Sequence, residues 1–292
     1  MNANPVTEQA ITFDCDGDAL VGILHVPAAP CDVGVVVIVG GPQYRAGSHR
    51  QFVLLARELA AAGYAVLRFD CRGMGDSGGA THRFEAVGAD IAAALVALQF
   101  AVPSVQRIAL WGLCDGASAA LLYVGATRDP RVTGMCLLNP WVRSTASLAR
   151  AHLKHHYAQR LRKRDFWAKL LRGRIGTQAL RGFIGSLRAR HAVEMAATSF
   201  QQRMARAWAT FGGQILLVLS GNDVTAKEFV EFTQHDVAWT QVFLHPRTQR
   251  HEVATADHTF SSDLWRNHVN EHSLRWLRGL AVARPVAQQE TT

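Results

Sequence analysis

A run of β-branched residues closed by two glycines constrains the fold more than any other stretch of this chain. Residues 33–41 read VGVVVIVGG, and a continuous apolar run without polar alternation is typical of a strand covered on both faces. Further strand-like runs, among them YAVLRFD, VQRIALWG and RVTGMCLLNP, alternate with segments of helical spacing at residues 50–62, 84–101 and 116–127. Because helices must connect such strands, the sequence predicts a doubly wound, mostly parallel α/β sheet.

The two ends of the chain extend this pattern. Residues 11–27 read ITFDCDGDALVGILHVP, two β-like runs around an Asp-Gly-Asp turn signal, and predict an opening hairpin. After an interruption, QILLVLSGND (214–223) predicts a strand, followed by a helix from about Ala226, a strand in AWTQVFLHP (238–246) and a last helix near 262–278. We therefore expect one α/β core made of residues 1–142 and 207–292, with residues 143–206 inserted into it.

The inserted segment has a composition of its own. It holds 15 Lys or Arg against two acids, whereas the rest of the chain holds 16 basic residues against 21 acids. Apolar side chains recur in it at helical spacing, at Phe166, Trp167, Leu170, Leu171 and Ile175. The pattern predicts a basic helical cap, which is either a solvated face over a packing stripe or a surface for an acidic partner such as a phosphate-bearing acyl carrier, an anionic lipid or a polysaccharide. Nucleic acid is not expected, because no signature of a nucleic-acid-binding fold accompanies the charge.

Cysteine usage and the N-terminus bear on location and cofactors. The five cysteines are odd in number, scattered and without C-x-x-C spacing, which favours reduced thiols over a disulfide framework or a zinc site. The N-terminal stretch MNANPVTEQAITF has no basic segment followed by an apolar one, and the run at 33–41 is too short to cross a bilayer. We expect a cytoplasmic protein with no transmembrane segment, no metal and no organic cofactor.

The stretch LWGLCDGA (110–117) joins a predicted strand to a predicted helix, which is the context of a nucleophile elbow. In the pattern G-x-Nuc-x-G, the central residue between Gly112 and Gly116 is Cys114, and Asp115 is displaced by one. Cys114 is therefore the expected nucleophile; the alternative is a small buried residue that only fills space. The helix N-terminus favours a thiolate and the Asp115 charge opposes it, so the direction of the Cys114 pKa shift stays open.

A nucleophile of this kind needs a base and an acid that orients it, in the chain order nucleophile, acid, histidine. Asp223 directly follows the apolar run of residues 214–220, although it would serve equally as the N-cap of the next helix. His258, in the loop ADHTFSS before the last helix, is the expected base. His251 is its rival in the same loop, and His245 is less suitable because it ends a predicted strand.

The oxyanion hole should combine the backbone N–H of the residue after the nucleophile with a donor from the loop GGPQYRAGSHR (40–50). The first donor is then the N–H of Asp115. Pro42 has no N–H, so the second donor is Gln43 or Gly41, and we expect Gln43. The glycine-rich turn DCRGMGDSGG (70–79) is expected to be mainly structural.

The motifs GGPQYRAGSHR, FDCRGMGDSGG, GLCDGAS, LSGND and ADHTFSS together resemble the α/β-hydrolase superfamily, and most closely the family called exosortase A system-associated hydrolase 1. The resemblance covers nearly the whole chain, and it implies an α/β-hydrolase fold with the basic insertion as its cap. It also implies a bacterial source and a role linked to exopolysaccharide or protein-sorting systems. The cysteine in the elbow is similar to that of dienelactone hydrolases, which use a Cys-His-Asp triad.

The expected function is hydrolysis of an ester or thioester, small or carrier-bound, through a covalent acyl-cysteine. Cys114 would attack the carbonyl, His258 would move the proton, and Asp223 would orient the imidazole. Two alternatives stay open. The same triad could transfer the acyl group to an alcohol or amine if water is excluded, or the chain could be a catalytically silent module that binds an acyl or glycan ligand.

Overall fold

The computed structural model describes residues 5–41, 43–143, 199–240 and 242–282. The chain divides into two compact units, residues 1–141 with 203–292 and residues 142–202. Most of the predicted cap, including its apolar stripe and its densest basic run at residues 162–164, lies outside the described residues. Its proposed boundaries of 143 and 206 therefore stay a prediction. No helix in the described ranges is long and apolar enough to cross a membrane.

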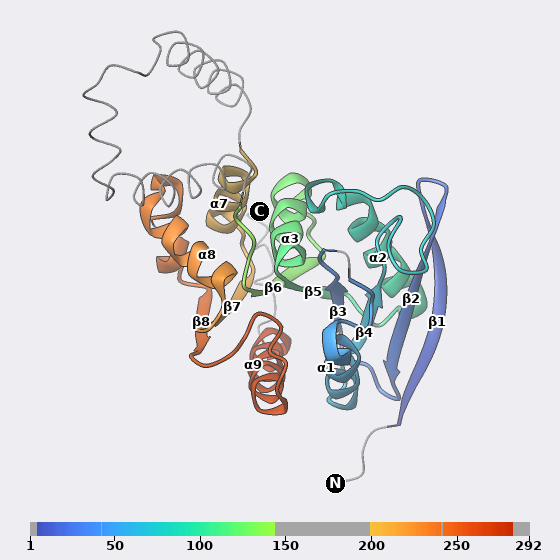
Figure 1. Ribbon diagram of the computed structural model, residues 1–292. Helices are drawn as coiled ribbons and strands as arrows, with labels where there is room; N and C mark the ends of the chain where they lie inside the picture. Colours follow the sequence, from blue (N-terminus) through green and yellow to red (C-terminus); the bar gives the residue numbers. More distant parts are fainter. Residues whose placement is uncertain (1–4, 42, 144–198, 241, 283–292) are drawn as a thin grey trace, which may run out of the picture. The chain divides into compact units, whose positions relative to one another are not determined.

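The first unit is built on an eight-stranded sheet with the order β1-β2-β4-β3-β5-β6-β7-β8 (Figure 1). Its strands are β1 Val6–Cys15, β2 Asp18–Pro27, β3 Val33–Ile38, β4 Ala65–Phe69, β5 Arg107–Leu113, β6 Val132–Leu138, β7 Gln214–Ser220 and β8 Thr248–Val253. β1 and β2 form the antiparallel hairpin, and β2 pairs antiparallel with β4. All strand pairs from β4 to β8 are parallel. The predicted doubly wound, mostly parallel α/β-hydrolase fold is confirmed for this unit.

Helices cover both faces of the sheet, and for this reason the central strand β3 is apolar throughout. α1 (Gln51–Ala61) and α9 (Asp263–Val282) lie on one side in Figure 1, and α2 (Gly88–Ala101) and α3 (Asp115–Thr127) lie on the other. Alternate residues of β3, Val33, Val35 and Val37, are buried in one core with side chains of α1 and α9. All six residues of β3 are buried, as the sequence predicted for a strand between two helical layers.

The predicted strand at residues 238–246 is wrong. The described residues there form two short 3-10 turns, η3 (Val237–Trp239) and η4 (Val242–Leu244), and the edge strand β8 begins later, at Thr248. The aromatic residues of this stretch pack against side chains of α7 (Phe200–Thr210) and α8 (Val224–His235): Trp239 contacts Trp208 and Phe229. Tertiary packing of these rings decides the local conformation, whereas β8 itself is a polar segment, TQRHEV, without a clear apolar signal.

The parallel arrangement brings the carboxyl ends of the strands to one edge of the sheet. β3 ends beside Gly40, β5 ends at the elbow, β7 is followed by Asp223, and the turn after β8 carries His258. In parallel sheets this edge is the usual place for a binding site. Cys114 thus lies at the same edge of the sheet as Asp223 and His258, which follow it in the chain by more than a hundred residues.

Candidate active site

Cys114 occupies a strained turn between β5 and α3. Its backbone has φ 61° and ψ −125°, a conformation that residues other than glycine rarely adopt. The turn is held by hydrogen bonds from Cys114 N to Leu138 O (2.8 Å) and from Trp141 N to Cys114 O (3.3 Å). Such a turn lifts the side chain of its central residue out of the sheet edge, which is the geometry of a nucleophile elbow.

The two glycines of the elbow are required by close backbone contacts. A Cβ atom on Gly112 would lie 2.6 Å from the nitrogen of Ala117, and one on Gly116 would lie 2.5 Å from the carbonyl oxygen of Ile38. Real Cβ atoms do not approach backbone atoms so closely. The G-x-C-x-G spacing therefore has a steric cause in this chain.

His258 and Asp223 form a hydrogen-bonded pair beside the elbow. The distance from His258 Nδ1 to Asp223 Oδ2 is 2.9 Å. The contact with Asp223 first, and the contact with Cys114 second, raise the pKa of His258 to about 10 in spite of its partial burial. The contact with Asp223 therefore makes the imidazole a stronger base than an unperturbed histidine. The structure thus places His258 between the carboxylate and the thiol.

Asp223 has a second task, because it also begins helix α8. Its carboxylate accepts hydrogen bonds from Thr225 N (3.2 Å) and Ala226 N (3.0 Å). Burial raises the pKa of this carboxyl, but the contact with His258 and the backbone donors outweigh burial and hold the pKa below its ordinary value. The sequence offered an N-cap and a partner for histidine as alternatives, and the geometry combines both.

The two other histidines considered from the sequence lie apart from Asp223. His251 is in strand β8, and its ring packs on His272 of α9 with 4.0 Å between the ring centroids. His245 follows the turn η4, and its Nδ1 atom accepts a hydrogen bond from Arg247 N (3.4 Å). Of the three candidates, His258 is the one that the structure brings to the acid.

Buried polar residues that the sequence analysis did not single out hold the His258 loop. Asn139, at the end of β6, donates from Nδ2 to His258 O (3.1 Å) and to Ser220 Oγ (2.8 Å). Ser220 in turn donates to Asp257 O (2.8 Å). The Asp257 carboxylate accepts from Thr259 N and from the hydroxyl and N–H of Ser261. These bonds tie the loop to β6 and β7 and restrict the position of the imidazole. The signal available in the sequence was Asn139, a polar residue directly after a buried strand.

On the other side of Cys114, the Asp115 side chain turns toward the segment after β3. Asp115 Oδ2 accepts the N–H of Gly41 at 2.7 Å. Burial raises the pKa of this carboxyl, and the N–H groups of Gly41, Asp115 itself and Gly116 act against that rise. Gln43, the expected second oxyanion donor, lines the adjacent cavity. The backbone N–H that points toward the start of α3, however, is that of Gly41, which donates to Asp115.

A cavity of about 730 Å³ adjoins the elbow. Asp115, Gly116 and Trp141 form its wall on the side of the nucleophile. The remaining lining mixes apolar side chains with polar ones: Val39, Met74, Phe84, Val87 and Ala119, and Gln43, Tyr44, Thr81, His82 and Arg83. Its size suits a small organic acyl group or a slightly larger ligand. In the described ranges, no group of three or more His, Cys, Asp or Glu side chains is arranged to hold a metal ion.

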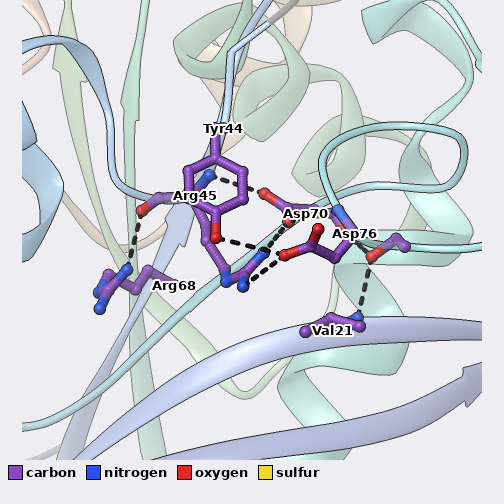
Figure 2. A network of polar contacts seen from close by, with 7 residues as sticks. Val21, Tyr44, Arg45, Arg68, Asp70 and Asp76 are labelled. Carbon is purple, nitrogen blue, oxygen red and sulfur yellow. Dashed lines mark hydrogen bonds and ion pairs between the residues drawn. The ribbon is translucent and has the colours of Figure 1, made fainter.

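An ion-pair network supports the far wall of this cavity, and the sequence gave little notice of it. Figure 2 shows Arg45 between Asp70 and Asp76. Arg45 donates to both carboxylates, Asp70 also accepts Arg45 N (2.6 Å), and Tyr44 donates its hydroxyl to Asp76 (3.2 Å). Arg68 donates to Arg45 O at 3.3 Å. The network joins the segment after β3 to the glycine-rich turn at residues 70–79, which explains the structural role expected for that turn.

Comparisons with known proteins agree with this architecture. The chain resembles an esterase of Pyrococcus furiosus, Pf2001, with a TM-score of 0.63 and 16% identity over 94% of this chain and 92% of the other. It also resembles Est1E from Butyrivibrio proteoclasticus, solved with ferulic acid bound, with a TM-score of 0.59 and 17% identity over 92% and 100% of the two chains. XC6422 from Xanthomonas campestris, described as a member of a/b serine hydrolase without lid, matches with a TM-score of 0.57 and 16% identity over 96% and 98%. A search of curated proteins returned no match.

The family comparison covers more than half of the sequence. A model of the family described as serine aminopeptidase, S33, matches residues 31–211. These residues include β3 to β6, the elbow and the segment between the two parts of the core. The family and XC6422 are described as serine enzymes, whereas the central residue of the elbow here is Cys114. With the parallel sheet, the elbow and the family match in agreement, this chain is an enzyme of the α/β-hydrolase type that belongs to the serine aminopeptidase, S33 family.

Proposed function

We propose that the protein hydrolyses carboxylic esters or thioesters through a covalent acyl-cysteine intermediate, with Cys114, His258 and Asp223 as its triad. The observation that carries this proposal is the 2.9 Å hydrogen bond between His258 and Asp223, made by two loops that converge on a cysteine with a positive φ. An acid that holds a base beside a partly accessible nucleophile is the arrangement that covalent acyl transfer requires.

The proposed reaction begins with Cys114. Its sulfur attacks the carbonyl carbon, the carbonyl π electrons move to oxygen, and the proton of the thiol passes to His258. The contact with Asp223 raises the pKa of His258 and so makes it a better acceptor for this proton. Collapse of the tetrahedral intermediate breaks the bond to the leaving group, which takes the proton from His258. The imidazole then removes a proton from water, and the resulting hydroxide attacks the thioester to release the acid and the thiol.

Asp223 would hold the imidazole in one orientation and stabilise its positive charge. The oxyanion would be held by the backbone N–H of Asp115 and by a second N–H from the segment after β3. Gly41, the alternative to the expected Gln43, is supported as this second donor by its hydrogen bond toward the start of α3. No step of this proposal draws on a metal or an organic cofactor.

Intact-protein mass spectrometry tests the proposal directly. The protein is incubated with activated esters and thioesters of graded chain length, and the wild type is compared with Cys114→Ala and with Cys31→Ala, a matched change at another half-buried thiol. We expect an acyl mass on the wild type and on Cys31→Ala, and none on Cys114→Ala. Acylation of Cys114→Ala to the same extent would exclude Cys114 as nucleophile.

The same experiment separates the two alternatives. Release of free acid from the acylated wild type supports hydrolysis, whereas a stable adduct released only by an added alcohol or amine supports acyl transfer. The silent binding module predicts no acylation at all, together with unaltered ligand binding by Cys114→Ala.

The substrate class and the link to exosortase or exopolysaccharide systems belong to this proposal as well. They rest on the family resemblance of the motifs and on the excess of 15 basic residues over two acids in residues 143–206. If this segment attracts an acidic acyl carrier, charge reversal of Arg162, Lys163 and Arg164 should slow the reaction with an acidic acyl donor and spare a neutral ester of the same acyl group. The difference should shrink as salt rises, because the Debye length falls from ~10 Å at 0.1 M to ~3 Å at 1 M. Equal slowing of both substrates would contradict the role in attraction.

A further inference from the structure

The carboxyl group of Asp115 lies where the backbone donors of the proposed oxyanion hole converge. Its Oδ2 atom accepts the Gly41 N–H at 2.7 Å. Among the described residues, this is the hydrogen bond that the carboxyl accepts, because its other oxygen, Oδ1, is buried without a partner. Gly41 N–H and Asp115 N–H are the two donors that the proposed reaction needs for the oxygen of the tetrahedral intermediate.

The carboxyl also fills the space between the segment after β3 and the start of α3. A Cβ atom on Gly40 would lie 2.0 Å from Asp115 Oδ1 and 2.5 Å from Gly116 N. The Oδ1 atom is buried and has no hydrogen-bond partner among the described residues. A substrate oxygen cannot enter a space that is already filled by an oxygen atom of the protein.

We propose that the side chain of Asp115 occupies the oxyanion hole of the resting enzyme and must turn out of it before acylation. This inference rests on the proposed acyl-cysteine reaction and adds a gate to it. When the bond between Cys114 Sγ and the carbonyl carbon forms, the carbonyl oxygen takes the electron pair and needs the N–H groups of Gly41 and Asp115. A carboxylate on the Gly41 N–H competes with that oxygen for the donor and repels the new negative charge.

The cavity beside the elbow provides the space for the displaced side chain. Asp115 lines this cavity of about 730 Å³, and so do His82 and Arg83. Arg83 also donates to Glu85 at 3.1 Å. A carboxylate that turns from the hole toward these basic side chains exchanges backbone donors for a solvated and positively charged surrounding. The side chain of Asp115 thus controls the acylation rate by filling or leaving the oxyanion hole. The backbone N–H of Asp115 itself binds the oxyanion.

The test compares Asp115→Ala and Asp115→Asn with the wild type, because both variants keep the backbone N–H of residue 115. Asp236→Asn is the control, since it removes the charge of a carboxylate that likewise accepts a backbone N–H, from Ala238 at 2.9 Å, and does not line the cavity. The rate constant of acylation is measured with p-nitrophenyl acetate by stopped flow, and the melting temperature is measured in parallel. An aldehyde inhibitor supplies a third measurement, because its thiohemiacetal carries an oxygen that needs the hole.

A gate predicts effects of opposite sign. Asp115→Ala should lower the melting temperature, because the Gly41 bond is lost, yet raise the acylation rate constant and the aldehyde affinity by ~10-fold or more, since one oxyanion donor contributes ~10²–10³-fold. Asp115→Asn should lie between Asp115→Ala and the wild type, and Asp236→Asn should match the wild type. A purely structural role lowers rate and melting temperature together, and that result would overturn the proposal.

The wild-type protein provides a check that does not depend on how the variants fold. On binding of the aldehyde, the ¹³C signal of the Asp115 carboxyl should shift, because the carboxyl gives up the N–H of Gly41. An adduct on Cys114 that leaves this signal unmoved would refute the gate while supporting the nucleophile. Absence of any acylation or adduct on wild-type Cys114 would instead refute the proposed function on which the gate rests.

Discussion

Replacing Asp223 by asparagine should separate the chemistry of the proposed triad from the capping of helix α8. The aspartate makes two kinds of hydrogen bond, one to His258 and two to the backbone at the start of α8. Asparagine caps helices about as well as aspartate, so Asp223→Asn should keep the start of α8, and its loss of stability at neutral pH should come from the His258 contact, about 2–3 kcal/mol for a fall of about 2 pKa units. The variant loses the charge that faces the imidazole.

The effect on His258 can be worked out from its pKa. The rise from 6.5 to about 10 corresponds to about 5 kcal/mol at about 1.4 kcal/mol per pKa unit, and Asp223 is the largest contributor. The imidazole side chain is 32% exposed, so solvent screening reduces this contribution, and we expect the pKa to fall by about 2 units in the variant. Loss of the orienting charge in such a triad lowers kcat by about 10⁴-fold.

The assay combines turnover of the best ester from the mass-spectrometry panel, an NMR titration of His258 and denaturant unfolding. Asp236→Asn is the matched control, because Asp236 caps the turn η3 through Ala238 N (2.9 Å) and faces no imidazole. It should leave turnover unchanged. If Asp223→Asn keeps more than about a tenth of the wild-type kcat, or if the pKa of His258 does not move, the role assigned to Asp223 is refuted.

Three further predictions concern single side chains. Iodoacetamide should alkylate Cys114 ahead of the other thiols and abolish esterase activity. The reason is that burial raises the pKa of the four other thiols, Cys15, Cys31, Cys71 and Cys136, the last to about 12. Peptide mapping that finds Cys71 or Cys136 modified first, with activity intact, would contradict this. His258→Ala should reduce turnover ~10²–10⁴-fold and His251→Ala far less, since a positioned general base contributes on that scale; equal losses in steady-state rates would remove the support for His258. His25 is buried beside Arg68, and desolvation first and Arg68 second lower its pKa to about 4. As the pH falls, the unfolded chain therefore binds this proton before the folded chain does. The contribution of His25 to the free energy of unfolding is fully present above pH 6.5 and should fall by about 3 kcal/mol as the pH drops toward 4. His25→Gln, which keeps an acceptor for Arg68, should flatten this part of the curve in denaturant unfolding, and an unchanged curve would contradict the assignment to His25.

The order of elements and the outline of the site could be predicted because both depend on local patterns. The glycine spacing around Cys114 is imposed by contacts of its own turn with Ile38 and Ala117, and a turn of this kind is visible in the sequence. Asp223 and His258 could be placed because each directly follows a strand or precedes a helix in a parallel sheet. The position of His258 directly before the last helix then ranked it above His251.

Features that depend on distant partners could not be predicted. The conformation of the Asp115 carboxyl is set by the N–H of Gly41, which is 74 positions away. The sequence around Asp115 therefore predicted only the effect of its charge on Cys114, and not the position of its side chain. Arg45 is buried because Asp70 and Asp76 face it across 25 and 31 positions. The edge strand β8 escaped notice because it is polar, while the aromatic stretch before it was taken for a strand although its rings pack against helices.

The backbone of Cys114 has a consequence for how this chain would change under relaxed selection. A cysteine with φ 61° is held in a conformation that costs about 1–3 kcal/mol in a residue with a side chain, whereas glycine adopts it without steric cost. Loss of the nucleophile by mutation to glycine would therefore make the protein more stable, and loss to alanine would not. Cysteine at this position is thus less favourable for stability than glycine. Relatives that no longer catalyse the reaction should therefore have glycine at this position more often.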